Sequence, residues 1–316
     1  MVKCSFCNKP AVIHLSYSKT NLCTKHFVYS VERRMKRTIR EYDMLRGAKH
    51  IGVAMSGGKD SQVLLYLLDK ITKPMKIKLT AILIDEGIDG YRDKIIPEAV
   101  KLTKELGIPL EIITFKGLVG NSLDEIMAIN KKHRMESSCT YCGVFRRYAL
   151  NNAAKRLKVD RLAIGHNLDD MIQGYMMNMM RNEDILFRFK PAGGAIEDDR
   201  FVMRIRPLFK IPEKEIALYA VLKGFKSVFV ECPYVREGFR PLVRDFINAT
   251  ESKYPGTKFK MLQSYIETSK KLSDCFSSSD KKEKKVSSCE ICGEPTSGTV
   301  CKSCRLIQQL KSKKKK

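Results

Sequence analysis

The sequence predicts an α/β fold, in which helices cover a parallel β-sheet and a small metal-binding module stands at each end of the chain. Two observations carry this prediction. Short apolar runs alternate with apolar residues at helical spacing through residues 48–275, as expected for repeated βα units. Cysteine pairs with the spacing of metal ligands lie before and after that region.

The composition indicates a globular protein with a polyanionic partner. The chain has 316 residues, of which 43% are hydrophobic and 30% charged, and its net charge is +24. The basic tail 311–316 supplies only five of the positive charges, so the excess is spread along the chain. A charge of this size favours a nucleic acid as partner over a role in solubility alone.

Nothing in the sequence predicts a membrane segment or a secretory signal. No apolar run approaches the roughly 20 residues that span a bilayer, and the polar start Met1–Ser5 leads directly into cysteines. We therefore expect a cytoplasmic protein. Eleven cysteines in such a protein indicate metal or redox chemistry rather than disulfides.

Residues 1–27 are predicted to form an N-terminal zinc module. Its ligands would be a Cys₃His set, in which a short strand within Ala11–Tyr17 separates the two pairs: Cys4, Cys7, Cys23 and His26. Residues 287–316 are predicted to hold a second module, a zinc ribbon followed by the basic tail, with the ligands Cys289, Cys292, Cys301 and Cys304. Four protein ligands leave no open position on a metal, so we expect two structural Zn²⁺ ions whose binding supplies the folding energy of these short segments.

Two linkers separate the modules from the catalytic domain. Residues 28–47 are expected to form a basic helix, since Arg33, Arg34, Lys36, Arg37 and Arg40 alternate with apolar residues. Its charged face is either simply solvated or an RNA contact. Residues 276–286 are polar and low in complexity and are predicted to be flexible.

The middle region supplies the elements of the sheet in order. Strands are expected at His50–Met55, Leu79–Ile84, Leu110–Phe115, Leu162–Gly165 and Val228–Val230. Helices are expected over Val63–Ile71, Ile95–Leu106, Leu123–Ile129 and Gly143–Leu157, and again from Asp169. In such a sheet, ligands bind at the carboxyl ends of the strands.

The loop after the first of these strands carries the strongest functional signal. It runs Ser56, Gly57, Gly58, Lys59, Asp60, Ser61. Adjacent glycines allow close approach of backbone N–H groups to a phosphate, and the start of a helix adds partial positive charge. The loop is not a Walker A motif, because Asp60 stands where a magnesium-binding hydroxyl would be needed.

This loop resembles the PP-loop of the N-type ATP pyrophosphatases. The resemblance implies a Rossmann-like domain over residues 48–275 that binds ATP with Mg²⁺ at Ala54 and at the loop residues, and releases pyrophosphate. In that topology Asp85, at the end of the second strand, would lie beside the adenosine. The segment from Gly165 to Asp170 is similar to the family's GHxxDD motif, where Gly165 would permit close approach and His166 would contact the nucleotide. Asp169 and Asp170 would hold magnesium or orient the base, or would only favour a helix start.

Four cysteines remain after the zinc ligands are assigned: Cys139, Cys142, Cys232 and Cys275. Alone, the C-x-x-C pair indicates either redox chemistry or half of a metal site. With Cys232, three thiolates are one short of the full set for a 4Fe–4S cluster, which would leave one iron open to sulfide. Cys275 lies at the edge of the linker and is interpreted as incidental.

The loop, the C-x-x-C pair, the distant cysteine and the terminal zinc modules together resemble the tRNA 2-thiolation enzymes, in the branch of archaeal and bacterial 2-thiouridine synthetases and their eukaryotic cytosolic relatives. The resemblance implies adenylation of a tRNA uridine at O2, followed by sulfur transfer to C2. It implies catalytic roles for Asp60, Asp170, Arg146, Cys139 and Cys232, with the cluster held by Cys139, Cys142 and Cys232. Partners would be tRNA and a sulfur donor, either sulfide or a ubiquitin-like thiocarboxylate carrier. A homodimer is also implied.

Three alternatives stay open on the sequence alone. The close cysteines would instead serve as a persulfide carrier and a resolving thiol. Another PP-loop enzyme, such as a lysidine synthetase or an amidating ligase, would explain the loop but not the spare cysteines. An RNA-binding scaffold without catalysis would explain only the charge and the zinc.

Overall fold

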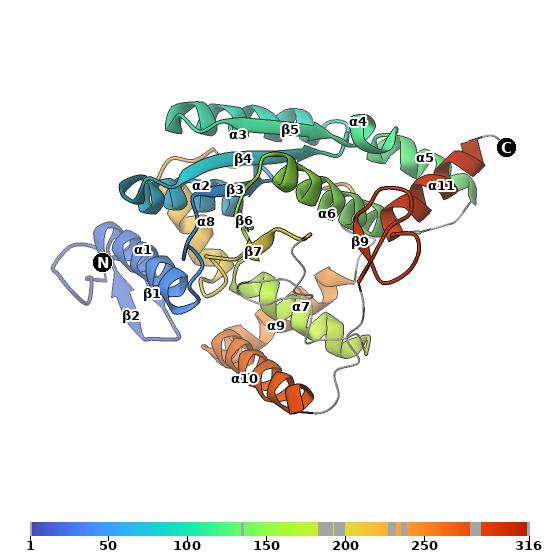
Figure 1. The fold of residues 1–316 in the computed structure, drawn as a ribbon. Coiled ribbons are helices and arrows are strands. Elements are labelled where there is room, and N and C mark those ends of the chain that lie inside the picture. Colours follow the sequence, from blue (N-terminus) through green and yellow to red (C-terminus); the bar gives the residue numbers. More distant parts are fainter. Residues whose placement is uncertain are drawn as a thin grey trace.

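A five-stranded parallel sheet forms the centre of the protein, with the strand order β5-β4-β3-β6-β7. Figure 1 presents the computed structural model, which describes residues 2–133, 136–182, 192, 200–226, 232–234, 239–278 and 286–314. The strands are β3 (His50–Met55), β4 (Lys78–Asp85), β5 (Leu110–Thr114), β6 (Arg161–Ala163) and β7 (Met203–Ile205). The predicted α/β class is confirmed.

Both faces of the sheet are covered by helices. On one face lie α2 (Lys59–Thr72), which continues into a 3₁₀ turn at Lys73–Met75, and α3 (Arg92–Leu106). On the other lie α4 (Phe115–Val119), α5 (Leu123–His133) and α6 (Ser138–Arg156). In β4, Ala81 and Leu83 join the core beneath α2, whereas Ile82 and Ile84 join the core beneath α6. This alternation of buried residues is expected for a strand that is covered on both faces.

A helical layer extends beyond β6 and β7. It comprises α7 (Leu168–Met180), α8 (Glu213–Leu222), α9 (Arg240–Lys253) and α10 (Thr257–Ser278). In Figure 1, α7, α9 and α10 lie together below the sheet, while α8 packs beside α2. Within the described residues, no helix is both long enough and apolar enough to cross a bilayer.

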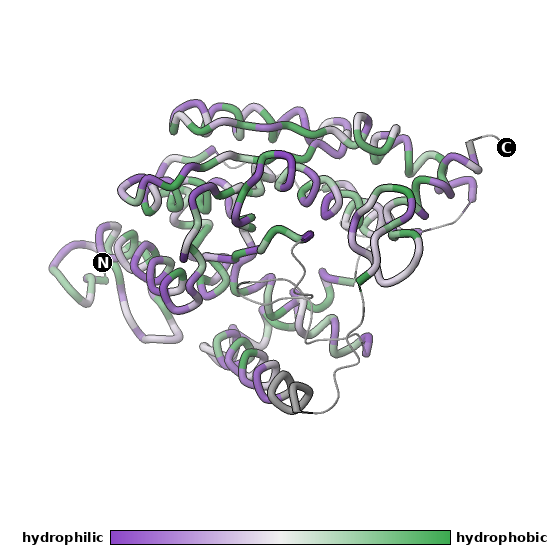
Figure 2. The backbone as a smooth tube through the Cα atoms, viewed as in Figure 1, coloured by the Kyte–Doolittle hydropathy of each residue, from purple (hydrophilic) through white to green (hydrophobic). Residues whose placement is uncertain are grey.

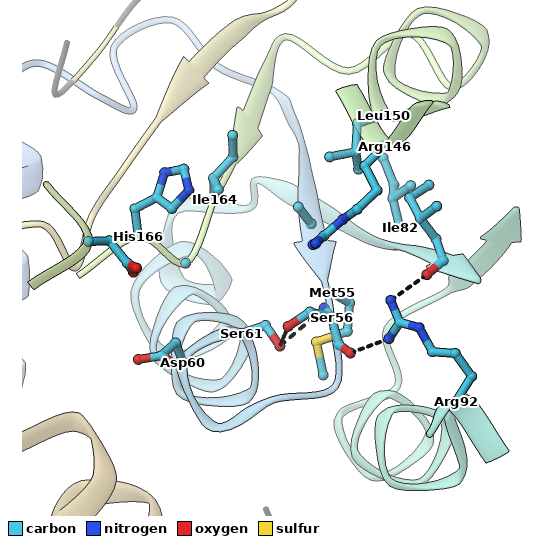
Figure 3. A pocket seen from close by; sticks show the side chains of 14 residues that line it. Met55, Ser56, Asp60, Ser61, Ile82, Arg92, Arg146, Leu150, Ile164 and His166 are labelled. Carbon is cyan, nitrogen blue, oxygen red and sulfur yellow. Dashed lines mark hydrogen bonds between the residues drawn. The ribbon is translucent and has the colours of Figure 1, made fainter. Parts of the chain in front are cut away.

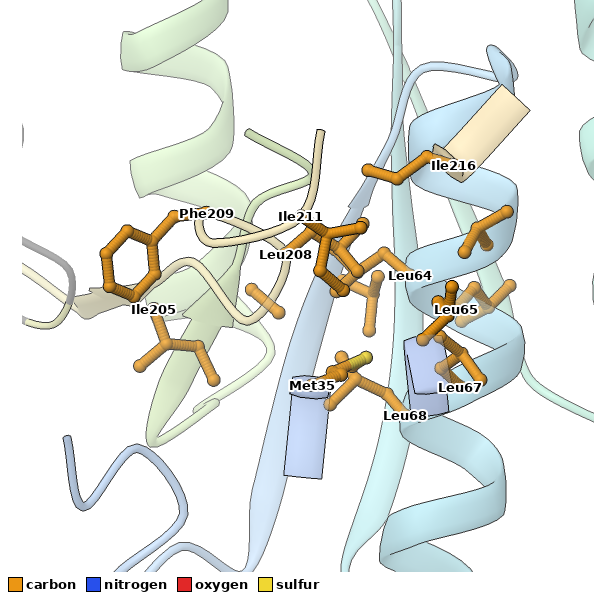
Figure 4. Close-up of a cluster of buried hydrophobic side chains, with 14 of the residues drawn as sticks. Met35, Leu64, Leu65, Leu67, Leu68, Ile205, Leu208, Phe209, Ile211 and Ile216 are labelled. Carbon is orange, nitrogen blue, oxygen red and sulfur yellow. The ribbon is translucent and has the colours of Figure 1, made fainter. Parts of the chain in front are cut away.

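The N-terminal module is a β-hairpin followed by a long helix. The hairpin pairs β1 (Ile13–Leu15) with β2 (Thr20–Leu22), and α1 (Thr24–Glu41) follows at once. The apolar face of α1, including Val31 and Met35, is fully buried against the catalytic domain. Figure 4 shows Met35 among the leucines of α2. The module therefore shares one core with the sheet instead of standing apart from it.

A buried ion pair also fastens α1 to the catalytic domain. The guanidinium of Arg34 pairs with the carboxylate of Glu215 on α8, and the Tyr17 hydroxyl donates to the same carboxylate over 2.8 Å. The Arg34 side chain is 16% exposed and that of Glu215 only 3%. Charges this poorly solvated are tolerated because each one is paired.

The C-terminal module packs on the outer side of α6. It consists of β8 (Ser287–Ser288), β9 (Pro295–Thr296) and α11 (Lys302–Lys314). Leu306 and Leu310 of α11 are buried in the same hydrophobic cluster as Phe145 of α6. The Glu294 carboxylate accepts hydrogen bonds from the Asn151 amide and, over 2.7 Å, from the Lys155 ammonium. The C-terminal module therefore supports α6. The sequence did not predict this contact.

Some boundaries differ from the predicted ones. The basic helix begins at Thr24 and ends at Glu41, whereas 28–47 had been expected. The helix predicted from Gly143 begins at Ser138, because the Ser137 side chain accepts a hydrogen bond from the Thr140 N–H and caps it earlier. The linker predicted at 276–286 begins later, since α10 continues to Ser278. Residues 279–285, the strand predicted at 228–230 and the Cys275 side chain lie outside the described residues.

The Arg34–Glu215 pair gives a test of how α1 is held. Glu215→Ala leaves a buried guanidinium without its charge partner, so we expect the free energy of unfolding to fall by about 3–5 kcal/mol. Glu41→Ala is the matched control, because its carboxylate is 44% exposed in the pair with Lys210 and its loss should cost under about 1 kcal/mol. Urea unfolding followed by circular dichroism measures both. Equal losses in the two variants would contradict this account.

Candidate functional site

The loop between β3 and α2 is organised by a single hydroxyl group. The Ser61 Oγ accepts hydrogen bonds from the backbone N–H groups of Ser56 and Gly57, at 3.2 and 3.1 Å, and donates to the Gly58 carbonyl over 2.9 Å. The Gln62 amide donates to the Gly57 carbonyl over 2.7 Å. The loop is thus rigid before any ligand binds, with the N-terminus of α2 directed to the end of the sheet (Figure 3).

Two glycines are required by this geometry. Gly57 has a φ of +82°, and a Cβ there would lie 2.1 Å from the Ile95 Cγ2 of α3. Gly165 follows β6, and a Cβ there would lie 3.3 Å from the backbone carbon of Asp60. The loop after β6 therefore crosses the start of α2 at backbone contact distance.

The first turn of α2 carries a cluster of alternating charges. The Lys59 ammonium lies 2.7 Å from the Glu213 carboxylate of α8 and 3.2 Å from that of Asp60. Burial opposes the charge of Lys59, but these carboxylates outweigh it and raise the lysine pKa. Burial raises the pKa of Asp60, with Lys59 and a 3.0 Å hydrogen bond from Asn167 acting against it. Glu213 and Asn167 were not singled out in the sequence.

The two adjacent aspartates of α7 have different surroundings. Asp169 is buried, where it pairs with Lys258 of α10 and accepts the Glu213 N–H over 2.8 Å. Asp170 lines the cavity described below, and its carboxylate caps α7 by accepting the Asn167 N–H. Burial and the neighbouring charge of Asp60 raise the pKa of Asp170 to about 6, against the opposing charge of Arg240. Asp169 is thus neutralised by Lys258 within the fold, whereas Asp170 faces the cavity.

His166 lies at the same edge, near several arginines. Its Nδ1 is 3.3 Å from the Nε of Arg206. Burial lowers the pKa of His166 to about 3, and the charges of Arg206, Arg240, Arg146 and Arg204 act in the same direction. At neutral pH this imidazole is therefore uncharged, so that it contributes hydrogen bonding and not positive charge.

An ion-pair network joins the loop to α6. Arg92 of α3 pairs with the buried Glu86 and donates to the Ser56 and Ile84 carbonyls, over 2.8 and 2.9 Å. Glu86 also pairs with Arg146 of α6, whose Nε is 3.2 Å from its carboxylate. Arg92 and Glu86 were missed in the sequence, although Glu86 directly follows the singled-out Asp85.

These elements surround a cavity of about 210 Å³. Its polar lining comes from Ser56, Asp60, Ser61, Arg92, Arg146, His166 and Asp170, and its apolar lining from Ala54, Met55, Ile82, Ile84, Leu150 and Ile164. Figure 3 shows Arg146 extending from α6 toward the loop. Asp85 does not line the cavity; its carboxylate instead accepts the Gly87 N–H over 2.9 Å.

The three spare cysteines gather on the α6 side of this cavity. Cys139 is exposed on the first turn of α6, while Cys142 and Cys232 are half-buried against one hydrophobic cluster. Burial raises the pKa of Cys142 to about 11; Arg146 opposes the shift and Cys232 adds to it. Burial also raises the pKa of Cys232, and Cys139 contributes to that rise. Thiols in this setting become ligands when a metal displaces their protons, so this donor set fits an iron–sulfur cluster.

Each predicted zinc set is assembled in space. In the N-terminal set, Cys4 and Cys23 Sγ lie 3.2 and 3.4 Å from the His26 Nδ1, and the Cys7 and Cys23 sulfurs are 3.7 Å apart. In the C-terminal set, the sulfurs of Cys292 and Cys301 are 3.7 Å apart. Ligands at zinc bonding distances stand about 3.3–3.8 Å from one another in a tetrahedron. Both sets therefore fit Zn²⁺.

The fold and the loop define a PP-loop ATP-binding domain. A family model described as a PP-loop domain matches residues 28–250, and a model of the N-terminal LIM domain of 2-thiouridine synthetase TtuA matches residues 3–28. The tRNA 2-thiolation protein NcsA of Haloferax volcanii is 36% identical, over 98% of this chain and 100% of its own. The tRNA-5-methyluridine(54) 2-sulfurtransferase of Pyrococcus horikoshii is 35% identical, over 96% of this chain and 93% of its own.

A solved structure agrees with these sequence comparisons. The U34-tRNA thiolase NcsA from Methanococcus maripaludis, determined with its [4Fe-4S] cluster, superposes with a TM-score of 0.82 at 35% identity, covering 98% of this chain and 97% of that one. The chain belongs to the PP-loop tRNA 2-thiolation proteins of the NcsA and TtuA family, which are related to the eukaryotic cytoplasmic tRNA 2-thiolation protein 1. The family predicted from the sequence is confirmed.

Gly57 provides a test of the loop geometry. Gly57→Ala places a methyl group against Ile95 and forces a left-handed backbone on alanine, so we expect the free energy of unfolding to fall by at least about 2 kcal/mol. In Gly58→Ala the φ is −75° and the nearest atom, the Ser56 Oγ, is 3.5 Å away, so the loss should stay under about 1 kcal/mol. Chemical denaturation distinguishes the two. A Gly57→Ala protein as stable as Gly58→Ala would refute the described loop.

Proposed function

We propose that this protein uses ATP to adenylate a tRNA uridine at O2 and then replaces that oxygen with sulfur, giving 2-thiouridine. One observation carries the proposal. The helix α6 presents Arg146 to the PP-loop cavity and, one turn earlier, Cys142 of the three-cysteine group. A lysidine synthetase or an amidating ligase would use the cavity but has no need of three thiols beside it.

The loop residues are suited to hold the triphosphate. The N–H groups at the start of α2 and the Lys59 ammonium would neutralise the departing pyrophosphate. Asp60 offers a carboxylate for the accompanying Mg²⁺. The apolar wall formed by Ala54, Ile82 and Ile164 would receive the adenine. The Asp85 carboxylate would reach the ribose only after its hydrogen bond from the Gly87 N–H had broken.

Asp170 is placed to handle the proton of the uridine base. When O2 attacks the α-phosphate, an O–P bond forms, the bond to pyrophosphate breaks and the N3 proton must leave. A carboxylate with a pKa of about 6 is ionised at neutral pH and basic enough to accept that proton. Arg146, a cation on the facing helix, would stabilise negative charge on the α-phosphate. A second step joins sulfur to C2 and releases AMP.

We assign Cys139, Cys142 and Cys232 as the ligands of a 4Fe–4S cluster. These three thiolates would hold the cluster by one ligand fewer than a full set, and the cluster would supply a site at which sulfide is delivered to the activated uridine. Burial raises the pKa of Cys142 to about 11, so this thiol is a poor nucleophile at neutral pH. In a persulfide mechanism the exposed Cys139 would therefore be the carrier and Cys142 the resolving thiol.

The proposal also includes two zinc ions, a sulfur donor, a cytoplasmic location, a homodimer and tRNA as the substrate. Each terminal Cys-rich set would hold one structural Zn²⁺. Sulfide or a ubiquitin-like thiocarboxylate would supply sulfur, and the protein would act in the cytoplasm as a homodimer. The relatives named above act on tRNA uridines, which supports tRNA as the substrate here.

The proposal is tested by an anaerobic single-turnover reaction with reconstituted protein, ATP, sulfide and unmodified tRNA, with nucleosides read by mass spectrometry. We expect 2-thiouridine from the wild type. Cys232→Ala should lose the broad absorption near 400 nm and give no product, while Cys275→Ala, a cysteine interpreted as incidental, should match the wild type. Consumption of ATP without a thiolated base would point to another PP-loop ligase. Full product from Cys232→Ala would remove Cys232 from the ligand set.

The raised pKa of Asp170 predicts a pH dependence. The carboxylate is the active form, so the single-turnover rate at saturating ATP should be constant above pH 7 and should fall as the pH drops through about 6. Asp170→Asn should lower the rate by about 10²–10⁴-fold and abolish that inflection. Asp245→Asn, on the exposed surface of α9, is the control and should keep the wild-type profile. An unchanged inflection in Asp170→Asn would assign the titration to another group.

A further inference from the structure

The helix α1 has two faces of opposite character. Its apolar face is buried at Phe27, Val31, Met35 and Ile39. The opposite face is exposed along its whole length and is basic apart from one tyrosine: Lys25, Tyr29, Arg33, Lys36, Arg37 and Arg40. The spacing of three and four residues places these side chains in one stripe. Figure 2 shows the two characters as alternating hydrophobic and hydrophilic segments of this helix.

This basic stripe lacks acidic partners. Residues 1–31 contain no aspartate or glutamate. The two glutamates of α1 are engaged elsewhere, Glu32 with Lys70 and Tyr219, and Glu41 with Lys210. Among the described residues, none of the five cations of the stripe forms an ion pair, whereas Arg34 on the inner side does. Their mutual repulsion is relieved when a polyanion binds.

Two aromatic rings stand at the N-terminal end of the stripe. Tyr29 is 61% exposed, and the Arg33 guanidinium carbon lies 5.9 Å from its ring centre. Phe6, between the zinc ligands Cys4 and Cys7, is 68% exposed and meets the His26 ring edge-on at 5.7 Å. Both rings are therefore accessible to a ligand from solvent. Aromatic rings beside arginines form the platform on which unpaired bases stack.

The stripe is rigidly connected to the candidate site. The zinc hairpin contacts α8 through Tyr17 and Glu215, and contacts α10 through Tyr17 and Phe259, whose rings are 4.7 Å apart. The same two helices supply Glu213 beside Lys59 and Lys258 beside Asp169. A ligand on the stripe is therefore held in a fixed relation to the cavity.

We propose that this stripe, together with Phe6, is an RNA-binding surface that holds an unpaired segment of the substrate tRNA at a distance from the modified uridine. The cations would contact phosphates, and Phe6 and Tyr29 would stack on bases. The identity of the RNA rests on the function proposed above, but binding to RNA does not require thiolation.

The test measures binding of fluorescent, unmodified tRNA to the full-length, zinc-loaded protein by anisotropy, from 50 to 300 mM salt. We expect the triple variant Arg33→Gln/Arg37→Gln/Arg40→Gln to bind at least about tenfold more weakly at low salt, with a salt slope smaller by about two to three. The matched control is Lys94→Gln/Lys101→Gln/Lys104→Gln, which removes three exposed charges from α3 and should bind like the wild type. Equal affinity of the two triple variants would overturn the proposal.

The aromatic residues are tested with a second RNA. We expect Phe6→Leu/Tyr29→Leu to weaken binding to single-stranded RNA by about 5–100-fold and to leave binding to a fully paired RNA duplex unchanged. Equal losses on both RNAs, or none, would refute the stacking role.

Thiolation at saturating tRNA separates this proposal from the proposed function. In the variants, a normal thiolation rate at saturating tRNA together with a raised KM for tRNA would support a remote binding surface. If the wild type gave no thiolated product, the proposed function would be rejected, but the comparison of RNA affinities would still stand.

Discussion

The pairing of β3 with β4 on one side and β6 on the other determines where this protein can bind a ligand. The chain leaves β3 through α2 on one face of the sheet and reaches β6 through α6 on the other, so the carboxyl ends of β3 and β6 are not covered by a crossover helix. The start of α2 and the loop after β6 meet there, separated by little more than backbone atoms because Gly165 has no side chain. The cavity, the charged first turn of α2 and the exposed edge of α7 all follow from this meeting point.

Around that point, most charged side chains are held in ion pairs. Glu86 joins Arg92 to Arg146, and Asp169 is neutralised by Lys258. Among the polar groups that line the cavity, burial raises the pKa of Asp60 and of Asp170 and lowers that of His166. Asp169 is thus neutralised by a partner within the fold, whereas Asp170, at the next position, faces the cavity.

The sequence was sufficient wherever function depends on local spacing. The four-residue groupings at the two ends of the chain, the loop between β3 and α2 and the strand at His50–Met55 were predicted where they occur. It was insufficient where partners come from distant segments. Glu213 lies 154 residues from Lys59, and no local pattern marks it as a partner. The start of α6 was placed too late because the helix period was read from apolar residues, whereas the cap at Ser137 extends the helix over the cysteine pair. The different surroundings of Asp169 and Asp170 depend on α10, which carries no motif.

The support that α11 gives to α6 has a consequence for biosynthesis. Leu306 and Leu310 cover the face of α6 that carries Phe145, yet they leave the ribosome after every strand of the central sheet. Until then, the sheet can assemble while one side of its catalytic helix remains bare and prone to aggregation. Nascent chains that stall before α11 has left the ribosome should therefore be clients of chaperones, because the core beside α6 is completed only when α11 packs against it.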